Sequence, residues 1–270
     1  MAQIRVGRKV MPKMEHVDFL GAAEVLPVPL RRVVTGMLRR RLGAQLTLDP
    51  QEFAGRRVLI LGPARTVDED LAALRPERFD LIVRMNNGLD TPIAALGPDP
   101  LRCDLLFHSL TTEARPVTPD KLTRAGIDIL VHRTPVRGAF LQTVLASRRL
   151  AGIARVRCLP MARHQSLANQ LDGFSPTTGL LAVSFFLDAP VAEVAVAGFT
   201  FFQTAYCRGY DPAVTDDAAA QRRIAAAAHH DPVAEARLLG RLLTQARDRG
   251  LTVTLGPAVQ AALEGAGQLR

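Results

Sequence analysis

Long hydrophobic runs and paired cysteines are both missing from this 270-residue sequence. No run reaches the roughly 18 apolar residues of a membrane span, because acidic residues and a proline interrupt the most apolar stretch, residues 180–202. Residues 1–20 lack the uninterrupted apolar segment of a signal peptide. The three cysteines, Cys103, Cys158 and Cys207, are far apart and indicate neither a disulfide framework nor a zinc site. We therefore expect a soluble, cytoplasmic protein.

The usual glycine-rich phosphate motifs are absent as well. The chain has neither G-x-G-x-x-G nor a P-loop, which argues against NAD and ATP as ligands. Its net charge is +8, but only Lys9, Lys13 and Lys121 are lysines. This abundance of arginine is also what an Arg- and Ala-rich proteome produces, so it is poor evidence for phosphate binding. No recognition motif or aromatic interleaving supports nucleic acid as a partner.

The N-terminal part of the chain carries most of the excess positive charge. Residues 1–50 hold nine basic and four acidic side chains. Within them, residues 29–43 place apolar side chains at near-helical spacing among five arginines. Such a helix either packs on the core with its arginines in solvent or makes a peripheral contact with an anionic membrane surface. We expect residues 1–55 to be a basic extension and residues 56–270 a single α/β domain.

From residue 56 onward, short apolar strands alternate with helical patterns. This alternation predicts an α/β fold with a mostly parallel sheet and helices on both faces. Ligands of such sheets bind at the carboxyl ends of the strands. Strands are predicted at 57–62, 79–85, 103–108, 127–132, 156–159, 193–197 and 251–255, and helices at 66–74, 138–150, 177–187 and 232–249. A long loop is expected at 199–216.

The first strand ends at Gly62 and turns into a helix. A glycine at such a turn lets the backbone approach a phosphate or ribose, although purely structural turns look the same. The helix opens with Asp68-Glu69-Asp70, which matches the D-x-D carboxylate pair of metal-dependent transferases. Because acidic residues favour the first turn of any helix, we expect no metal here.

The second strand, in the sequence FDLIVRMNNGL, is followed by Asn86. The side-chain amide of Asn86 can both donate to and accept from a nucleotide sugar. Arg84 alternates with apolar residues and is a candidate interior ion-pair partner. Taken alone, such residues are also common turn formers.

The segment SPTTGLLAVSFFL contains a favourable helix start. Ser175 suits the N-cap and Pro176 the N1 position, which puts Thr177, Thr178 and Gly179 in the first turn. Free amides and a positive dipole make this end a site for phosphate or carboxylate, and Gly179 leaves room for a ligand. A well-capped core helix is the simpler alternative.

A second helix start follows in HHDPVAEARLL. Asp231 suits the N-cap with Pro232 at N1, so His230 precedes the helix. The positive helix end lowers the pKa of that imidazole and keeps it neutral, as a general base requires. Glu235 is close enough to orient neighbouring groups. His229 competes for the catalytic role, and a lone histidine at a helix end is often only a cap.

Both tyrosines of the chain, Tyr206 and Tyr210, lie in the predicted loop together with Arg208. Phenol hydroxyls and a guanidinium over a phosphate would stabilise a departing nucleotide. A loop anchored by its tyrosines is the alternative interpretation.

The order VLILG, DLIVRMN, PTTG, GF and H-x-x-x-x-E resembles the large, small and very small sialylmotifs of the sialyltransferases. The resemblance covers about residues 56–250. It implies a CMP-binding variant of the nucleotide-sugar transferase fold and an inverting, metal-independent transfer of sialic acid to a glycan or glycolipid. A 2-keto-3-deoxy acid such as Kdo is a related donor. Where the family has Gly-Asn-Ser after the first strand, this chain has Gly62-Pro63-Ala64, and the family's cysteine pair has no match.

The resemblance also implies roles for individual residues. His230 would be the catalytic base, Glu235 would support the site, and Tyr206 or Tyr210 would bear on the leaving phosphate. Residues expected to bind the CMP-sugar donor are Gly62, Ala64, Asn86, Ser175, Thr177, Thr178, Gly179, Gly198, Phe199, Tyr206 and Tyr210, with no metal or other cofactor. Two alternatives stay open: a non-catalytic nucleotide-binding protein of the same fold, and a metal-dependent transferase that uses Asp68 and Asp70.

Overall fold

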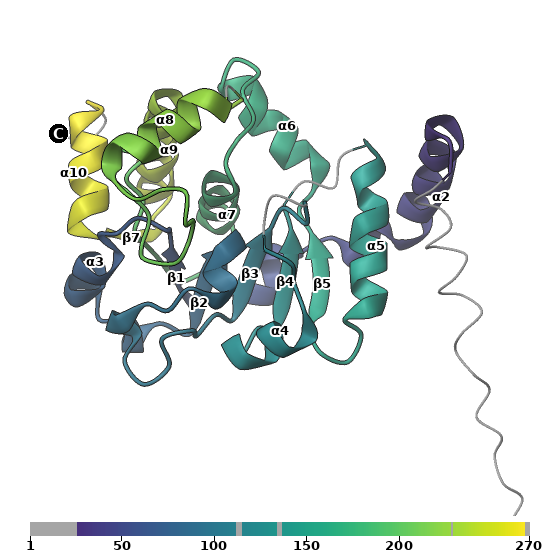
Figure 1. Cartoon of the computed structure of the whole chain (residues 1–270), viewed down its shortest axis with the longest axis horizontal. Coiled ribbons are helices and arrows are strands. Elements are labelled where there is room, and N and C mark those ends of the chain that lie inside the picture. Colours follow the sequence, from purple (N-terminus) through teal and green to yellow (C-terminus); the bar gives the residue numbers. More distant parts are fainter. Residues whose placement is uncertain (1–25, 112–114, 134–136, 228, 268–270) are drawn as a thin grey trace, which may run out of the picture.

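The computed structural model describes residues 26–111, 115–133, 137–227 and 229–267. Within these ranges, seven strands form one sheet in which every neighbouring pair is parallel (Figure 1). The strand order is β5-β4-β3-β2-β1-β6-β7. The strands are β1 (Arg57–Leu61), β2 (Leu81–Met85), β3 (Leu105–His108), β4 (Ile129–His132), β5 (Arg155–Cys158), β6 (Glu193–Ala197) and β7 (Thr252–Leu255).

Alternate residues of each strand point to opposite faces, and each face buries its apolar set against helices. On one face, Val58 and Ile60 of β1 lie in the main core with the side chains of α6, α7 and α9. On the other, Leu59 and Leu61 pack against α3, while α4 and α5 cover β3 and β4. The helices are α2 (Val28–Leu46), α3 (Val67–Leu74), α4 (Pro119–Ala125), α5 (Phe140–Arg149), α6 (Met161–Gln170), α7 (Thr178–Leu187), α8 (Asp217–Ala227), α9 (Pro232–Asp248) and α10 (Pro257–Gly265).

Helix α7 is the central element of the main core. Every residue of α7 is buried, which explains why its sequence is apolar all round instead of amphipathic. Phe185 and Phe186 make edge-on ring contacts with Phe53 and lie beside Phe107 of β3. This packing fixes the helix under the sheet and so fixes the position of its first turn.

The direction of the strand order reverses between β1 and β6. From β1 the chain adds β2 to β5 on one side, and β6 and β7 then lie on the other. In open parallel sheets the crevice at this reversal, outside the carboxyl ends of the strands, is where ligands bind. The topology therefore places a binding crevice above Leu61 and Ala197.

The predicted fold class is confirmed: the protein is α/β, with a parallel sheet covered by helices on both faces. All seven predicted strands are present with ends shifted by at most two residues, and the four predicted domain helices are found. Helices α4, α6, α8 and α10 were not predicted. Helix α6 shows why, because Leu167 is its only buried side chain and leaves no apolar stripe to recognise.

The described part of the N-terminal region packs on the sheet. Helix α2 covers the outer side of α5 (Figure 1), Leu48 and Phe53 lie in the main core, and the amide of Leu48 donates to the carbonyl of Cys158. Residues 46–53 are thus joined to the α/β domain. Among the described residues, no helix combines the length and the apolar character needed to cross a bilayer.

Candidate active site at the switch point of the sheet

A cavity of about 1070 Å³ lies at the carboxyl edge of the sheet. Its walls include Pro63 and Ala64 beyond the end of β1 and the residues that directly follow β2 and β6, together with the first turn of α7, the tyrosine loop and the residues before α9. Most of the site residues predicted from the sequence line it: Ala64, Asn86, Thr177, Thr178, Gly179, Gly198, Phe199, Tyr206, Tyr210, His230 and Glu235. Segments that are far apart in the chain thus meet at the switch point.

Gly62 and Gly198 hold the ends of β1 and β6 close together. The backbone of Gly198 has a φ of 69°, and a Cβ atom on either glycine would collide with the other's carbonyl group. Gly62 does not line the cavity; this packing between strand ends explains its glycine, and its contact with a ligand stays a prediction. Gly179 is likewise explained by protein atoms, since a Cβ there would lie 2.5 Å from the ring of Phe199.

The start of α7 differs from the prediction by two residues. The N-cap is Thr177, whose hydroxyl oxygen accepts from the amide of Leu180 at 3.2 Å, and the helix begins at Thr178. Ser175, predicted as the N-cap, lies outside the cavity. Its amide donates to the carbonyl of His229 at 2.8 Å. The cap on Leu180 leaves the amides of Thr178 and Gly179 as the donors at the positive end of the helix.

Glu235, on the first turn of α9, decides where α7 begins. Its carboxylate accepts from the amide of Thr177 at 2.6 Å and from the hydroxyl of Thr177 at 2.7 Å. The side chain is buried, and burial raises the pKa of this carboxyl to about 7 even though both hydrogen bonds act in the opposite direction. Glu235 therefore joins the two helix starts and positions Thr177.

His230 precedes α9 as predicted, with Asp231 capping the amides of Val233 and Ala234 at 3.0 and 2.9 Å. Its Nδ1 lies 2.5 Å from the carbonyl oxygen of Ser175. Because a carbonyl only accepts, Nδ1 carries the proton, and the neutral ring has its lone pair on Nε2.

The pKa of His230 is lowered, as expected, but the main cause differs from the one predicted. Burial lowers it to about 4, with smaller contributions from His229 and Arg133, whereas we had expected the dipole of the helix. Nε2 is therefore unprotonated at neutral pH. His229 also lines the cavity, with its ring 4.2 Å from that of His230.

Asn86 connects three walls of the cavity. Its side chain donates to the hydroxyl of Thr178 at 3.2 Å and accepts from the amide of Ser109 at 3.1 Å, and it shares a hydrogen bond with Tyr210. Its backbone φ is 45°, a left-handed conformation that asparagine tolerates better than most residues. Asn86 therefore links the residues after β3 and the tyrosine loop to α7 and fixes the hydroxyl of Thr178.

The tyrosine loop covers the opposite wall. Tyr206 forms an isolated antiparallel bridge with Ala64, and its ring lies 5.0 Å from that of Tyr210. Burial raises the pKa of Tyr206 to about 12 and raises that of Tyr210 as well. Both phenols are therefore hydrogen-bond donors throughout the physiological range. Arg208 is exposed and does not line the cavity, so the guanidinium predicted at this point is not there.

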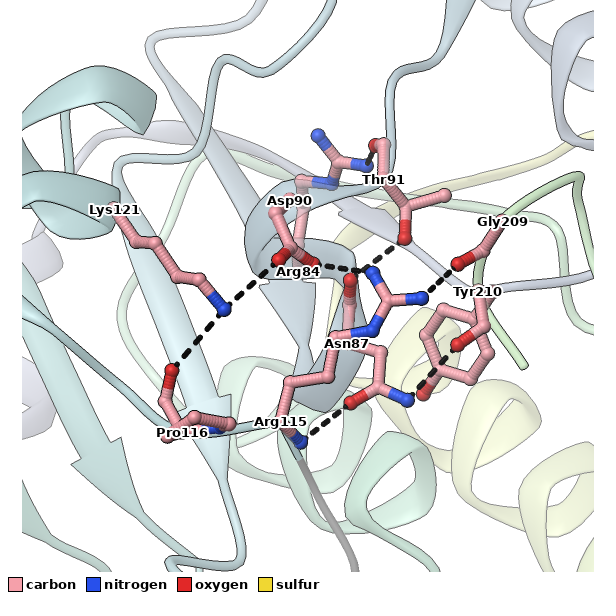
Figure 2. A network of polar contacts seen from close by, with 9 residues as sticks. All are labelled: Arg84, Asn87, Asp90, Thr91, Arg115, Pro116, Lys121, Gly209 and Tyr210. Carbon is pink, nitrogen blue, oxygen red and sulfur yellow. Dashed lines mark hydrogen bonds and ion pairs between the residues drawn. The ribbon is translucent and has the colours of Figure 1, made fainter. Parts of the chain in front are cut away.

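Figure 2 shows the polar contacts that hold the tyrosine loop against the segment after β2. The side chain of Asn87 donates to the carbonyl of Tyr210 at 2.9 Å and accepts from the amide of Arg115 at 2.9 Å. The guanidinium of Arg115 pairs with Asp90 at 2.6 Å and donates to the carbonyl of Gly209. Lys121 adds a second ion pair to Asp90 at 3.0 Å. This network ties the tyrosines to the segment that follows β2.

Sequence reasoning missed several polar residues of the cavity. Ser109 follows β3 and Arg133 follows β4, and the rule that ligands lie at strand ends was the signal that would have found both. The guanidinium of Arg133 donates to the carbonyl of Pro176 at 2.8 Å. Arg222 and Arg223 belong to α8, a helix with no recognisable pattern. These arginines make the cavity suitable for an anionic ligand.

The acidic triplet and Arg84 have structural roles away from the cavity. Asp70 is buried and accepts from the amides of Gly198 and Ala258 at 2.7 Å each, and Asp68 accepts from the amide of Ala95 at 2.8 Å. Neither carboxylate lines the cavity. Buried Arg84 donates to the carbonyls of Pro100 and Thr91 and not to the carboxylate that was expected. Within the described residues, no cluster of metal-ligating side chains occurs.

No protein-family model and no curated protein matches this sequence. Two solved structures that it resembles are sialyltransferases. A mammalian sialyltransferase in complex with Gal-beta-1-3GalNAc-ortho-nitrophenol aligns at 17% identity with a TM-score of 0.45, over 81% of this chain and 85% of that chain. The sialyltransferase CstII from Campylobacter jejuni, in complex with cytidine-5'-monophosphate, aligns at 18% identity with a TM-score of 0.40, over 56% of this chain and 64% of that chain. Likeness at this level does not assign an activity to the protein.

Proposed function

We propose that this protein is an inverting glycosyltransferase that moves sialic acid, or a related 2-keto-3-deoxy sugar acid, from its CMP conjugate to a glycan or glycolipid hydroxyl. One observation carries the proposal: His230, with its lone pair on Nε2, lines the same cavity as the first turn of α7 at the switch point of the sheet. The order of the motifs supports it, because it resembles that of the sialylmotifs. We propose that the reaction takes place in the cytoplasm.

In this reaction the acceptor oxygen attacks the anomeric carbon of the donor sugar from the side opposite the phosphate. The acceptor's proton passes to Nε2 of His230 while the bond from the anomeric carbon to the phosphate oxygen breaks and CMP keeps the electron pair. Attack from the opposite side inverts the anomeric centre. The hydrogen bond from Nδ1 to Ser175 orients the ring and stabilises the imidazolium that forms.

The leaving CMP needs donors for its phosphate. The amides of Thr178 and Gly179 stand at the positive end of α7, and the phenols of Tyr206 and Tyr210 stay protonated. We propose that these groups bind the phosphate as negative charge builds on it, which is a contribution that fixed donors make best in a pocket shielded from water. Asn86 would hold Thr178 in place and contact the nucleotide.

The proposal is tested with the purified full chain, CMP-sialic acid, CMP-Kdo and a panel of acceptors, with CMP release as the readout. We expect turnover that EDTA leaves unchanged and that His230→Ala abolishes. His229→Ala is the matched control, because it removes the neighbouring imidazole from the same cavity, and it should retain most of the rate. Loss of activity on adding EDTA, restored by a divalent metal, would contradict the metal-independent reaction.

A non-catalytic nucleotide-binding protein is the second candidate, and one observation favours it. Ala64 follows β1 on the cavity wall, where the resembling family has a polar side chain after its glycine. The wall at this point is therefore apolar and offers no side-chain hydrogen bond to a donor. Binding of CMP measured by calorimetry, with no release from any CMP-sugar, would establish this second function instead.

A further inference from the structure

Helix α2 has two apolar faces, and the fold accounts for only one. The inner face places Leu38, Leu42 and Leu46 in a cluster with Phe140 of α5, and the guanidinium of Arg39 lies 5.5 Å from the ring centre of Phe140. These contacts attach the helix to the domain. The cluster does not include the apolar side chains on the side of α2 that faces away from α5.

The outer face carries the three most exposed large hydrophobic side chains of the described chain. Leu30 is 56% exposed, Val33 64% and Met37 66%. Their spacing of three and four residues puts them on one side of the helix. Val28, at the first position of α2, is 51% exposed and adds to the apolar surface. We call Leu30, Val33 and Met37 the outer stripe.

The charge around the outer stripe has one sign. Helix α2 contains five arginines and no acidic residue, and Arg32, Arg40 and Arg41 are exposed. Long cationic side chains beside an apolar stripe suit the boundary of an anionic bilayer, because the stems cover apolar surface while the guanidinium groups reach the lipid phosphates. Figure 1 shows α2 on the outside of α5, at the end of the molecule opposite α10, where it can lie flat on a surface.

We propose that α2 is a peripheral membrane anchor: its outer stripe inserts into the interfacial region of an anionic lipid bilayer and its exposed arginines bind the headgroups. The inner face then holds the α/β domain on the membrane through α5. Length agrees with this arrangement, since 19 residues of α-helix extend about 28 Å along a surface. The inference stands apart from the transfer reaction, and its test needs no turnover.

The absence of tryptophan from the chain allows a direct test of insertion. Met37→Trp in the full-length protein gives a single tryptophan on the outer stripe. Its emission should shift to the blue, and brominated lipids should quench it, on vesicles with one third phosphatidylglycerol but not on pure phosphatidylcholine. Ile153→Trp is the matched control, because Ile153 is 40% exposed outside α2, and its emission should not change. An unshifted Met37→Trp spectrum on vesicles that bind the protein overturns the proposal.

The electrostatic part is tested by vesicle flotation. Arg40→Glu with Arg41→Glu should reduce the partition coefficient on anionic vesicles about tenfold or more, since each basic residue near such a surface contributes about 1 kcal/mol. Arg237→Glu with Arg241→Glu makes the same charge change on exposed positions of α9 and should reduce it far less. Equal losses in both double variants would show attraction by net charge alone and overturn the proposal. The wild-type protein could instead form a dimer without lipid, and the double variant Leu30→Ser with Met37→Ser could be monomeric. That result would assign the outer stripe to a second copy of the chain and would also overturn the proposal.

Discussion

Two histidine sites near the carboxyl edge of the sheet share a depressed pKa but differ in what surrounds the ring. His108 and His132 end β3 and β4, pair in register and are buried at 1% and 2% exposure. Nδ1 of His108 accepts from the amide of Leu110 at 2.9 Å, so the proton of the neutral ring is on Nε2. His230 has the opposite tautomer and lines the cavity. Burial lowers the pKa to about 4 at all three.

A lowered pKa therefore does not by itself identify a general base. The two strand-end imidazoles are closed off by protein atoms, and their neutral form serves the packing of the domain. His230 combines the same neutrality with an open side and a proton fixed on Nδ1. Access and tautomer together distinguish a ring that can take a proton from a substrate from one that cannot.

The largest expected effect is a loss of activity at His230 that does not occur at His132. His230→Ala should lower kcat by about a thousandfold, within the range for loss of a general base, with little change in the urea midpoint. His132→Asn should leave kcat of the folded enzyme within about threefold and lower the urea midpoint, because it breaks the hydrogen bond of His132 to Thr143 at 2.8 Å. Steady-state kinetics and urea unfolding on both variants check this. Comparable kcat values in the two variants would erase the distinction.

A second, smaller effect is expected at Glu235, which positions the start of α7 beside His230. Glu235→Gln should lower kcat/KM by about ten- to a hundredfold and stability by about 1 to 3 kcal/mol, because its single amide oxygen can replace only one of the two carboxylate oxygens that accept from the amide and the hydroxyl of Thr177. Thr177→Ser keeps that hydroxyl and serves as the control, with kinetics near those of the wild type. Equal kinetics in Glu235→Gln and the wild type would mean that Glu235 does not position α7.

The free energy of unfolding should depend on pH through three histidines and Glu235. His108, His132 and His230 bind fewer protons folded than unfolded between pH 4 and 6.5, so their contribution is present above pH 6.5 and lost as the pH falls toward 4. Glu235 has a raised pKa and acts in the opposite direction, since its contribution is lost as the pH rises through about 7. The contributions of the three imidazoles together are larger than the opposing contribution of Glu235, so the free energy of unfolding should fall as the pH is lowered.

The contribution of His132 to this pH dependence can be measured in the variant His132→Asn. Urea unfolding at pH 7 and pH 4.5 should show an acid-induced loss about 2 kcal/mol smaller in His132→Asn than in the wild type. An equal loss in both proteins would show that His132 is already solvated in the folded state, and the contrast with His230 would be wrong.

The smallest effect concerns the support of the tyrosine loop. Arg115→Ala removes the ion pair with Asp90 and the hydrogen bond to the carbonyl of Gly209. It should raise KM for the CMP-sugar about three- to tenfold while costing less than about 1 kcal/mol of stability, as partly exposed ion pairs do. Lys121→Ala leaves the contacts of Arg115 intact and should change KM less. A larger effect of Lys121→Ala would show that charge at Asp90 matters more than the loop anchor.

Much of this architecture was predictable from the chain alone, and particular residues show where the limit lies. Apolar runs such as RVLILG and EVAVA predicted β1 and β6, and Asp231-Pro232 predicted the start of α9, because these signals are local. The start of α7 was predicted two residues early, because Glu235, 58 residues away, bonds Thr177. The packing of Gly62 on Gly198 was not predicted, because it is a contact between strand ends that only the fold brings together.

A crystal structure of the full-length protein with CMP tests whether cytidylate binds between the start of α7 and His230. We expect the nucleotide in the crevice between β1 and β6, with its phosphate at the amides of Thr178 and Gly179 and with His230 facing the space beyond the phosphate. A nucleotide bound elsewhere on the protein, or one held through a metal ion by Asp68 and Asp70, would contradict it.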